Sequence, residues 1–202
     1  MQVKKDEVRK ALLEAGEKEF FSKGFMNASV RVIVKAAGTT IGNFYNYFEN
    51  KEALFAELVN EEYRGFVYLF ENHEEIEKPD YLLGIKDAAK WREVLVKLIK
   101  DIMPVFSDRF LLLVEHSGGT KFENIRDVIV NMLKDHFIGH MKRFDDNYED
   151  GVLGGILGEQ LLNGVVLILK KHRDEEIRKK LLAEYLLFFF MGTMGVLGNG
   201  SL

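Results

Sequence analysis

The sequence predicts an all-α protein of about nine helices. Apolar residues recur three and four positions apart along most of the 202 residues, which is the spacing of one helix face. No sustained alternation of apolar and polar residues is present, and no Asn-Gly or Asp-Gly hairpin separates two β-branched runs. Pro79 and Pro104 are the two prolines. With 47% hydrophobic and 30% charged residues, the composition is typical of a globular protein that buries a core.

The first predicted helix covers about residues 5–23 and ends at Gly24, which suits the left-handed conformation of a helix end. Phe25 is then expected to pack back against the helix. The apolar stripe of this helix is Leu12, Ala15, Gly16 and Phe20. A second short helix follows to about Ala37, and we expect the Ser29 hydroxyl to cap it by accepting from its first backbone N–H groups.

The third predicted helix is short, about seven residues, and it follows a tight turn at Gly38. Thr40 is its expected N-cap, and Phe44 and Phe48 are expected to anchor it in the core. A fourth helix begins near residues 50–52 and runs to about Asn72, because its apolar residues keep helical spacing. These elements place residues 1–50 in one domain and residues 51–202 in another.

Five further helices are predicted in the second domain. They cover about residues 86–103, 106–117, 121–146, 152–172 and 174–197. The last two form an antiparallel hairpin, because basic residues 170–173 end one helix and acidic residues 174–176 begin the next, which suits both helix dipoles. The domain as a whole is expected to be an antiparallel helical bundle.

Charge is distributed unevenly along the chain. The net charge is −4, but residues 1–51 carry nine Lys/Arg against six Asp/Glu, which leaves 19 against 26 for the rest. Two short helices joined by a tight glycine turn, within this cationic segment, have the form of a helix-turn-helix. An ordinary helical hairpin is the alternative interpretation of the pattern alone. Residues beyond the pattern must therefore decide between the two.

One long motif supplies those residues. It comprises Leu12, Ala15, Gly16, Phe20, Gly24, Phe25, Ser29, Val30, Arg31, Ile33, Lys35, Ala36, Ala37, Gly38, Thr40, Gly42, Phe44, Tyr45, Tyr47, Phe48, Asn50, Lys51, Glu52 and Leu54. The motif resembles the DNA-binding domain of the TetR family of bacterial repressors, over about residues 10–60. Three positions depart from the family pattern. Thr39 replaces a usual valine, Val32 a usual acidic residue, and Ile41 a residue that is often basic or polar.

The absence of cysteine favours a reducing compartment, so we expect the protein to be cytoplasmic. The resemblance implies a homodimer that binds a palindromic DNA operator and releases it when a small-molecule effector binds the C-terminal domain. It implies DNA contacts by Ser29, Arg31, Thr40, Ile41, Gly42, Asn43, Tyr45, Asn46, Tyr47 and Lys51. Arg31 suits guanine, and either asparagine suits adenine. Lys51 is expected to hold a phosphate at the start of its helix. Packing in the core is the alternative role for the two tyrosines.

Two further sites are expected in the second domain. The candidate effector-binding residues are Trp91, Phe106, Phe110, His116, Phe137, Met141, Glu159 and Asn163. The glycines of the fourth bundle helix suit close helix approach, and the resemblance places the dimer interface on the last two helices. The candidate interface residues are Gly154, Gly158, Leu162, Leu187, Phe190 and Met191. Burial of these residues within one subunit is the alternative.

No enzyme site is expected. The sequence has no cysteine, no serine–base arrangement and no His-Glu-x-x-His motif, although His136 and His140 are four residues apart. We therefore expect no catalytic residue, no metal and no cofactor. No membrane partner is expected either, because the apolar run from Tyr185 to Met191 is shorter than the ~20 residues of a membrane span. The alternative function is a small helical enzyme or protein-binding protein that uses the helix-turn-helix for something other than DNA.

Overall fold

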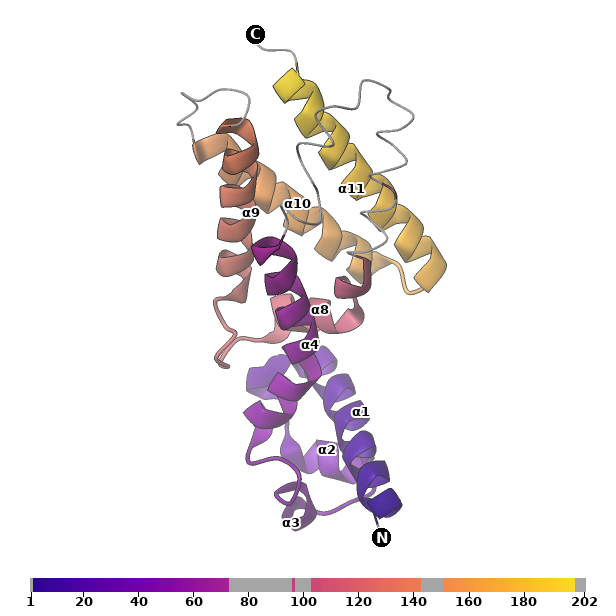
Figure 1. The fold of residues 1–202 in the computed structure, drawn as a ribbon. Coiled ribbons are helices and arrows are strands. Elements are labelled where there is room, and N and C mark those ends of the chain that lie inside the picture. The colour runs from indigo at the N-terminus through magenta and orange to yellow at the C-terminus, as the bar shows by residue number, and fades with distance from the viewer. Residues whose placement is uncertain (1, 73–95, 97–102, 143–150, 199–202) are drawn as a thin grey trace. The chain divides into compact units, whose positions relative to one another are not determined.

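The structure is a computed structural model that describes residues 2–72, 96, 103–142 and 151–198 (Figure 1). Its elements are α1 (Gln2–Asn27), α2 (Val30–Ala36), α3 (Ile41–Phe44), α4 (Lys51–Glu71), the 3₁₀ helix η1 (Met103–Val105), α8 (Asp108–His116), α9 (Ile125–Lys142), α10 (Gly151–Lys171) and α11 (Glu175–Gly198). None of the described residues lies in a strand. The predicted all-α class is confirmed, and the helix predicted over about residues 86–103 lies, except for Val96 and Met103, outside the described residues.

The chain folds into two compact units. The first comprises residues 1–64 and 108–126 and contains α1, α2, α3, α8 and the first part of α4. The second comprises residues 65–107 and 127–202 and contains α9, α10 and α11. Contacts therefore group the start of α4 with the three N-terminal helices, whereas the sequence places a domain boundary after residue 50.

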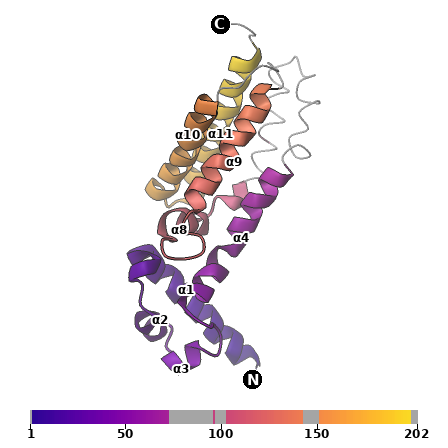
Figure 2. The same cartoon turned by 90° about the vertical axis from the view of Figure 1, so that its left-hand side faces the viewer.

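A cluster of three phenylalanines lies at the centre of the first unit. The ring centroid of Phe55 is 5.1 Å from that of Phe20 and 5.5 Å from that of Phe25, with edge-to-face geometry in both pairs. Gly24 has a φ of 70°, which interrupts the helical backbone of α1 and returns Phe25 toward the helix. The predicted break at Gly24 is confirmed. Figure 2 shows α2 and α3 at the end of this unit, beside α1.

The second unit is built on close contact between helices. A Cβ atom at Gly158 of α10 would lie 3.1 Å from the carbonyl oxygen of Val130 and 3.2 Å from the Cβ of Leu133, so the backbones of α9 and α10 nearly touch there. On another face of α10, Gly164 leaves room for the ring of Tyr185 from α11. The Tyr185 hydroxyl donates a hydrogen bond to the Gln160 carbonyl at 2.5 Å, and burial raises the pKa of Tyr185. Small residues therefore determine how the three helices pack.

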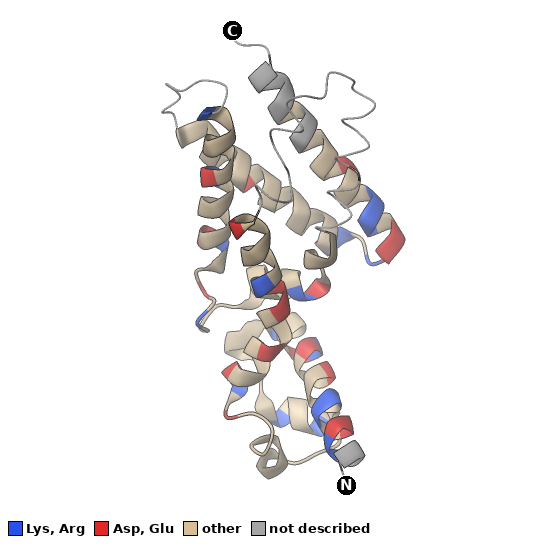
Figure 3. Ribbon diagram, in the orientation of Figure 1, with Lys and Arg blue, Asp and Glu red and all other residues tan. Residues whose placement is uncertain are grey.

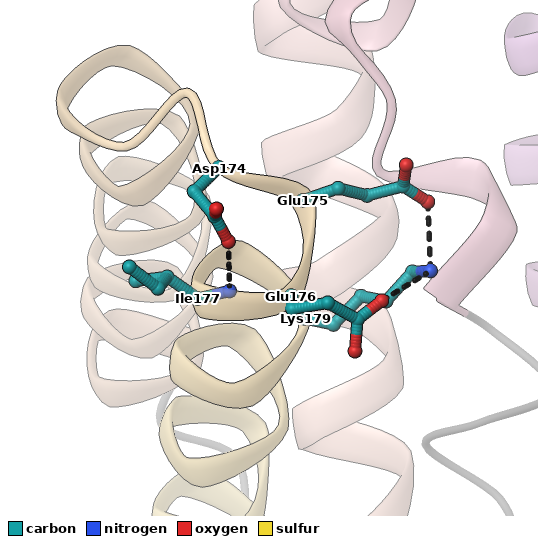
Figure 4. Close-up of polar contacts among 5 residues, drawn as sticks. All are labelled: Asp174, Glu175, Glu176, Ile177 and Lys179. Atoms are coloured by element: carbon teal, nitrogen blue, oxygen red, sulfur yellow. Dashed lines mark hydrogen bonds and ion pairs between the residues drawn. The ribbon is translucent and has the colours of Figure 1, made fainter.

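The α10–α11 hairpin has the predicted charges at its turn (Figure 4). The Asp174 carboxylate accepts from the Ile177 backbone N–H at 2.9 Å and caps α11. Lys179 Nζ lies 2.7 Å from a Glu175 carboxylate oxygen and 3.3 Å from one of Glu176. The hydrogen bond and charge of Lys179 lower the pKa of Glu175. The predicted antiparallel pair of helices is confirmed.

Within the described part of the chain, α10 is the one helix with the length and apolar composition to cross a membrane. A helix buried in a protein core passes the same test. Gly154, Gly158, Leu162, Val165, Val166 and Leu169 of α10 are buried inside this chain. The sequence analysis had instead considered the apolar run that lies in α11.

Candidate nucleic-acid interface

The turn between α2 and α3 is held by backbone hydrogen bonds. Gly38 has a φ of 67°, a left-handed conformation that favours glycine, and its N–H donates to the Lys35 carbonyl at 3.2 Å. The next residue, Thr39, donates its N–H to the carbonyl of Val34 at 2.9 Å. These bonds close the end of α2 and fix where α3 begins. The tight turn predicted at Gly38 is confirmed.

The start of α2 differs from the prediction. Ser29 occupies the N-cap position, but its hydroxyl makes no capping hydrogen bond. Its backbone N–H instead donates to a carboxylate oxygen of Glu19 on α1 at 3.2 Å. The predicted cap position is therefore right and the predicted capping bond is wrong, because a long-range contact with α1 fixes this residue.

Helix α3 is shorter than predicted. The Thr40 hydroxyl accepts from the Asn43 backbone N–H at 3.2 Å, as expected of an N-cap. After Phe44 the backbone tightens, because the N–H groups of Asn46 and Tyr47 bond to carbonyls three residues earlier. Phe44 and Phe48 are buried, as predicted, which leaves the opposite face of α3 at the surface.

The surface of α3 and of the turn that follows it is uncharged. Ile41, Gly42, Tyr45 and Asn46 are exposed, and Asn43 is half-buried. A Cβ atom at Gly42 would meet no atom within 4 Å, so this position is open to a close approach. Figure 3 shows Lys, Arg, Asp and Glu positions on the ribbon of the helices around α3 and none on α3 itself. Arg31 and Lys35 are exposed on the adjoining α2.

A chain of side-chain hydrogen bonds crosses this surface. Asn43 Nδ2 donates to the Thr39 hydroxyl oxygen at 2.8 Å, and Asn43 Oδ1 accepts from Asn46 Nδ2 at 3.2 Å. The sequence analysis noted Thr39 only as a departure from the family pattern and assigned it no role. The available signal was the spacing of Thr39 and Asn43, because residues four apart face each other on a helical turn.

Lys51, which was expected to hold a phosphate, makes its contacts inside the protein. Its Nζ donates to the carbonyls of Phe25 at 2.6 Å, Ala28 at 3.0 Å and Met26 at 3.4 Å. The ammonium also lies 4.4 Å from the centre of the Phe25 ring, and burial lowers its pKa. Lys51 thus satisfies carbonyls at the end of α1, so its contact with a phosphate stays a prediction.

We expect Lys51→Met to lower the free energy of unfolding by about 1–3 kcal/mol, because charged hydrogen bonds to these carbonyls are lost while the aliphatic stem remains. Lys35→Met removes an exposed lysine of α2 and is the matched control, with a change within about 0.5 kcal/mol. Chemical denaturation followed by circular dichroism measures both. Equal stability of the two variants would contradict a structural role of the Lys51 ammonium.

The other predicted DNA contacts lie together in the first unit, on α2, on α3 and in the turns that flank α3. Arg31 is exposed and Ser29 half-buried. Tyr45 is exposed, with its ring edge-to-face against Phe44, whereas Tyr47 is half-buried. The predicted residues therefore lie together in the first unit. Their contact with DNA stays a prediction.

The predicted effector residues that the structure describes are divided between the two units. Phe110 is fully buried in the first unit, where His116 packs against Phe21. Phe106, Phe137, Met141, Glu159 and Asn163 belong to the second unit, and Trp91 lies outside the described residues. A pocket of about 410 Å³ in the second unit is lined by Met141, Leu153, Leu157, Gln160, Tyr185, Phe188, Phe189 and Gly192. Of the predicted residues that the structure describes, Met141 is the one that lines it.

Three predicted dimer contacts face the interior of the chain. Gly154 and Gly158 pack against α9, and Leu162 is buried. Close helix approach was the right reason for these glycines, but α9 of the same chain, rather than a second copy, is the partner. Leu187 is half-buried on α11, and the side chains of Phe190 and Met191 lie outside the described residues.

The rings of His136 and His140 on α9 meet edge to face. The ring centroids of His136 and His140 are 4.4 Å apart. Among the described residues no group of three or more His, Cys, Asp or Glu side chains could hold a metal ion. No donor set for a metal is therefore present in this part of the chain.

A fold with a tight two-helix turn, buried anchors and an exposed polar helix defines a helix-turn-helix protein. Residues 12–58 match the family described as bacterial regulatory proteins, tetR family. The N-terminal domain of this chain is therefore similar to the N-terminal domain of that family. The match begins in α1 and ends in α4, so it contains the whole turn described above.

Two curated relatives match the same region. The HTH-type transcriptional regulator YdgC of Bacillus subtilis (strain 168) is 51% identical over 61 residues, which is 30% of this chain and 31% of YdgC. The HTH-type transcriptional repressor DhaR of Mycobacterium sp. (strain GP1) is 39% identical over 54 residues, 27% of each chain. This chain thus spans under a third of the length of either relative. The relatives are regulators and not enzymes.

Solved structures match almost the whole chain at low identity. The TetR-family regulator PfmR from Thermus thermophilus has a TM-score of 0.57 at 17% identity, over 89% of this chain and 97% of PfmR. NalD is the secondary repressor of the MexAB-OprM multidrug efflux pump in Pseudomonas aeruginosa. It has a TM-score of 0.51 at 21% identity, over 93% of this chain and 96% of NalD. These matches show that the fold of the second unit also occurs in TetR-family proteins.

Proposed function

We propose that this protein is a cytoplasmic transcriptional repressor that binds a palindromic DNA operator as a homodimer and releases it when a small molecule binds. The observation that carries the proposal is the coincidence of the family match at residues 12–58 with a structurally complete helix-turn-helix. The exposed, uncharged surface of α3 supports insertion between phosphate backbones, since base edges are recognised by polar and apolar side chains.

Each proposed DNA contact has a separate role. Asn43 and Asn46 pair with adenine, and Ile41 contacts thymine methyl groups. Gly42 allows the backbone to approach the bases, because no side chain surrounds it. Arg31 recognises guanine from the start of α2. The remaining contacts, to phosphates or thymine methyl groups, come from Ser29, Thr40, Tyr45 and Tyr47. Lys51 contacts a phosphate by exchanging one of its three carbonyl hydrogen bonds for it.

A second copy of the chain accounts for the exposed apolar residues of α10 and α11. Val152, Ile156 and Leu167 are exposed on α10, and Ile177 and Phe188 on α11. Exposed apolar patches on globular proteins commonly mark protein–protein interfaces. The same contact explains why α10 is apolar enough to resemble a membrane helix. Leu187 on α11 stays a candidate for this interface.

The pocket of the second unit is the proposed effector site. Its walls are mainly apolar or aromatic, and Gln160 and Tyr185 add polar atoms that could orient a ligand. An apolar or aromatic small molecule suits this lining. Of the residues predicted from sequence, Met141 contributes directly to the pocket wall.

Gel-shift measurements on duplexes selected from a random library test the proposal. We expect one selected duplex to bind at least about 1,000-fold more tightly than a scrambled one, with affinity falling between about 50 and about 200 mM salt. Asn43→Ala should cost about 1–3 kcal/mol on the selected duplex and nothing on the scrambled one. Failure of the wild-type protein to select any duplex would refute DNA recognition, and a monomer in sedimentation would refute the dimer.

A further inference from the structure

We propose that the Thr39 hydroxyl orients the Asn43 carboxamide for base recognition and thereby sets the preference of this protein for one base pair of its operator. The inference rests on the proposed function and names a positioning residue outside the DNA contacts assigned above. It begins from the 2.8 Å hydrogen bond between Asn43 Nδ2 and Thr39 Oγ1.

Thr39 is a fixed point relative to α2. Its backbone N–H donates to the carbonyl of Val34 at 2.9 Å, and Val34 is itself buried. The residue before it, Gly38, is held in the left-handed turn by its bond to Lys35. A hydroxyl attached to this backbone has little freedom to move. The Thr39 hydroxyl is therefore a hydrogen-bond acceptor for Asn43 whose place is set by the end of α2.

Two hydrogen bonds hold the Asn43 carboxamide, one at each end. Nδ2 donates to Thr39, and Oδ1 accepts from Asn46 Nδ2 at 3.2 Å. A carboxamide has two N–H donors and two acceptor lone pairs, so one donor and one acceptor remain. Adenine presents one acceptor, N7, and one donor, the N6 amino group, in the major groove. The bonds within the protein therefore leave the two groups that adenine requires.

Pre-orientation strengthens such a contact because a free asparagine side chain loses rotamer entropy when it pairs with a base. It also favours adenine over other bases, since a carboxamide that rotates freely could present its donor and acceptor to other edges. The Thr39 hydroxyl thus acts on the specificity at one base pair, and a general loss of affinity is not expected when it is removed.

Thr39→Val tests this role because it removes the hydroxyl and keeps the shape of the side chain. On duplexes selected by the wild-type protein, each base pair is replaced in turn and affinity is measured. The base pair that Asn43 recognises is the one at which Asn43→Ala binds the original and the replaced duplex equally well. At this base pair, we expect Thr39→Val to reduce the ratio of the two affinities about two- to tenfold. Thr39→Ser should restore it. In the Asn43→Ala background, Thr39→Val should have no further effect.

A measurement on the free protein separates this inference from the proposed function. In ¹⁵N–¹H spectra, the side-chain amide signals of Asn43, assigned by their loss in Asn43→Ala, should shift in Thr39→Val. Ser22→Ala removes an exposed hydroxyl of α1 and is the matched control, which should leave them unchanged. Unshifted signals in Thr39→Val would overturn the inference without any reference to DNA.

The DNA measurements have equally definite outcomes. Unchanged discrimination in Thr39→Val overturns the inference and leaves DNA recognition intact. Equal losses on all duplexes, together with a lower melting temperature, also overturn it, because Thr39 is then part of the framework alone. If the wild-type protein selects no duplex, the proposed function fails, and the inferred role in base preference fails with it, whatever the spectra show.

Discussion

Phe55→Ala is expected to lower the free energy of unfolding of the first unit by about 3–5 kcal/mol. Phe55 is fully buried and joins α4 to both sides of the Gly24 break through Phe20 and Phe25. Its removal leaves a cavity between elements that hold α2 and α3 in place. Sequence-specific DNA binding should be lost at temperatures where the wild-type protein still binds.

Circular dichroism melting and hydrogen exchange of the α1 and α2 amides measure this loss. Tyr68→Ala is a control on the part of α4 that belongs to the second unit. Tyr68 is 61% exposed, so its loss should cost less than about 0.5 kcal/mol. Phe55→Leu should lie between the two variants. A Phe55→Ala protein as stable as Tyr68→Ala would show that the cluster does not hold the unit together.

Gly158→Val should destabilise the second unit by about 3 kcal/mol through overpacking. A Cβ atom there would lie within 3.1–3.3 Å of the Val130 carbonyl oxygen, the Leu133 Cβ and the Lys134 backbone nitrogen. Backbone atoms cannot rotate away as the end of a side chain can. Helices α9 and α10 must therefore separate, which also changes the pocket that both helices line.

Gly155→Ala is the control, three residues earlier on α10. Its added Cβ would meet only Lys134 Cδ, at 3.9 Å, so the change should stabilise the helix by about 0.5–1 kcal/mol. Opposite signs are therefore expected for two substitutions of neighbouring glycines. Melting temperatures measured at one protein concentration give the comparison, since the proposed dimerisation would make them concentration-dependent. Equal shifts would contradict the close helix contact.

The short-range features of the candidate site follow from the sequence because they depend on neighbours along the chain. Gly24 and Gly38 have the positive φ values that their positions predict. The Thr40 hydroxyl caps α3 by accepting from the backbone N–H of Asn43, three residues later. Phe44 and Phe48 are buried, as their spacing indicates. These outcomes need no knowledge of how the helices pack.

Features that depend on distant residues did not follow in the same way. Ser29 was expected to cap its own helix, but its backbone contacts Glu19, ten residues earlier. Lys51 has the charge of a phosphate ligand, and the carbonyls that surround it come from residues 25–28. A charged or polar side chain is equally suited to solvent, to a ligand and to a distant backbone group, so residue type alone does not choose between them.

Residue order over short distances was enough to predict the all-α class, the two glycine turns and the likeness of residues 12–58 to a known family, although α3 is shorter than predicted. Tertiary structure alone decided the partners of those helices. It directed Gly154 and Gly158 of α10 toward α9 within one chain, and it joined Thr39 to Asn43 on the surface of α3. The physical reason is that side-chain partners are selected by the three-dimensional packing of whole helices, which a local pattern does not contain.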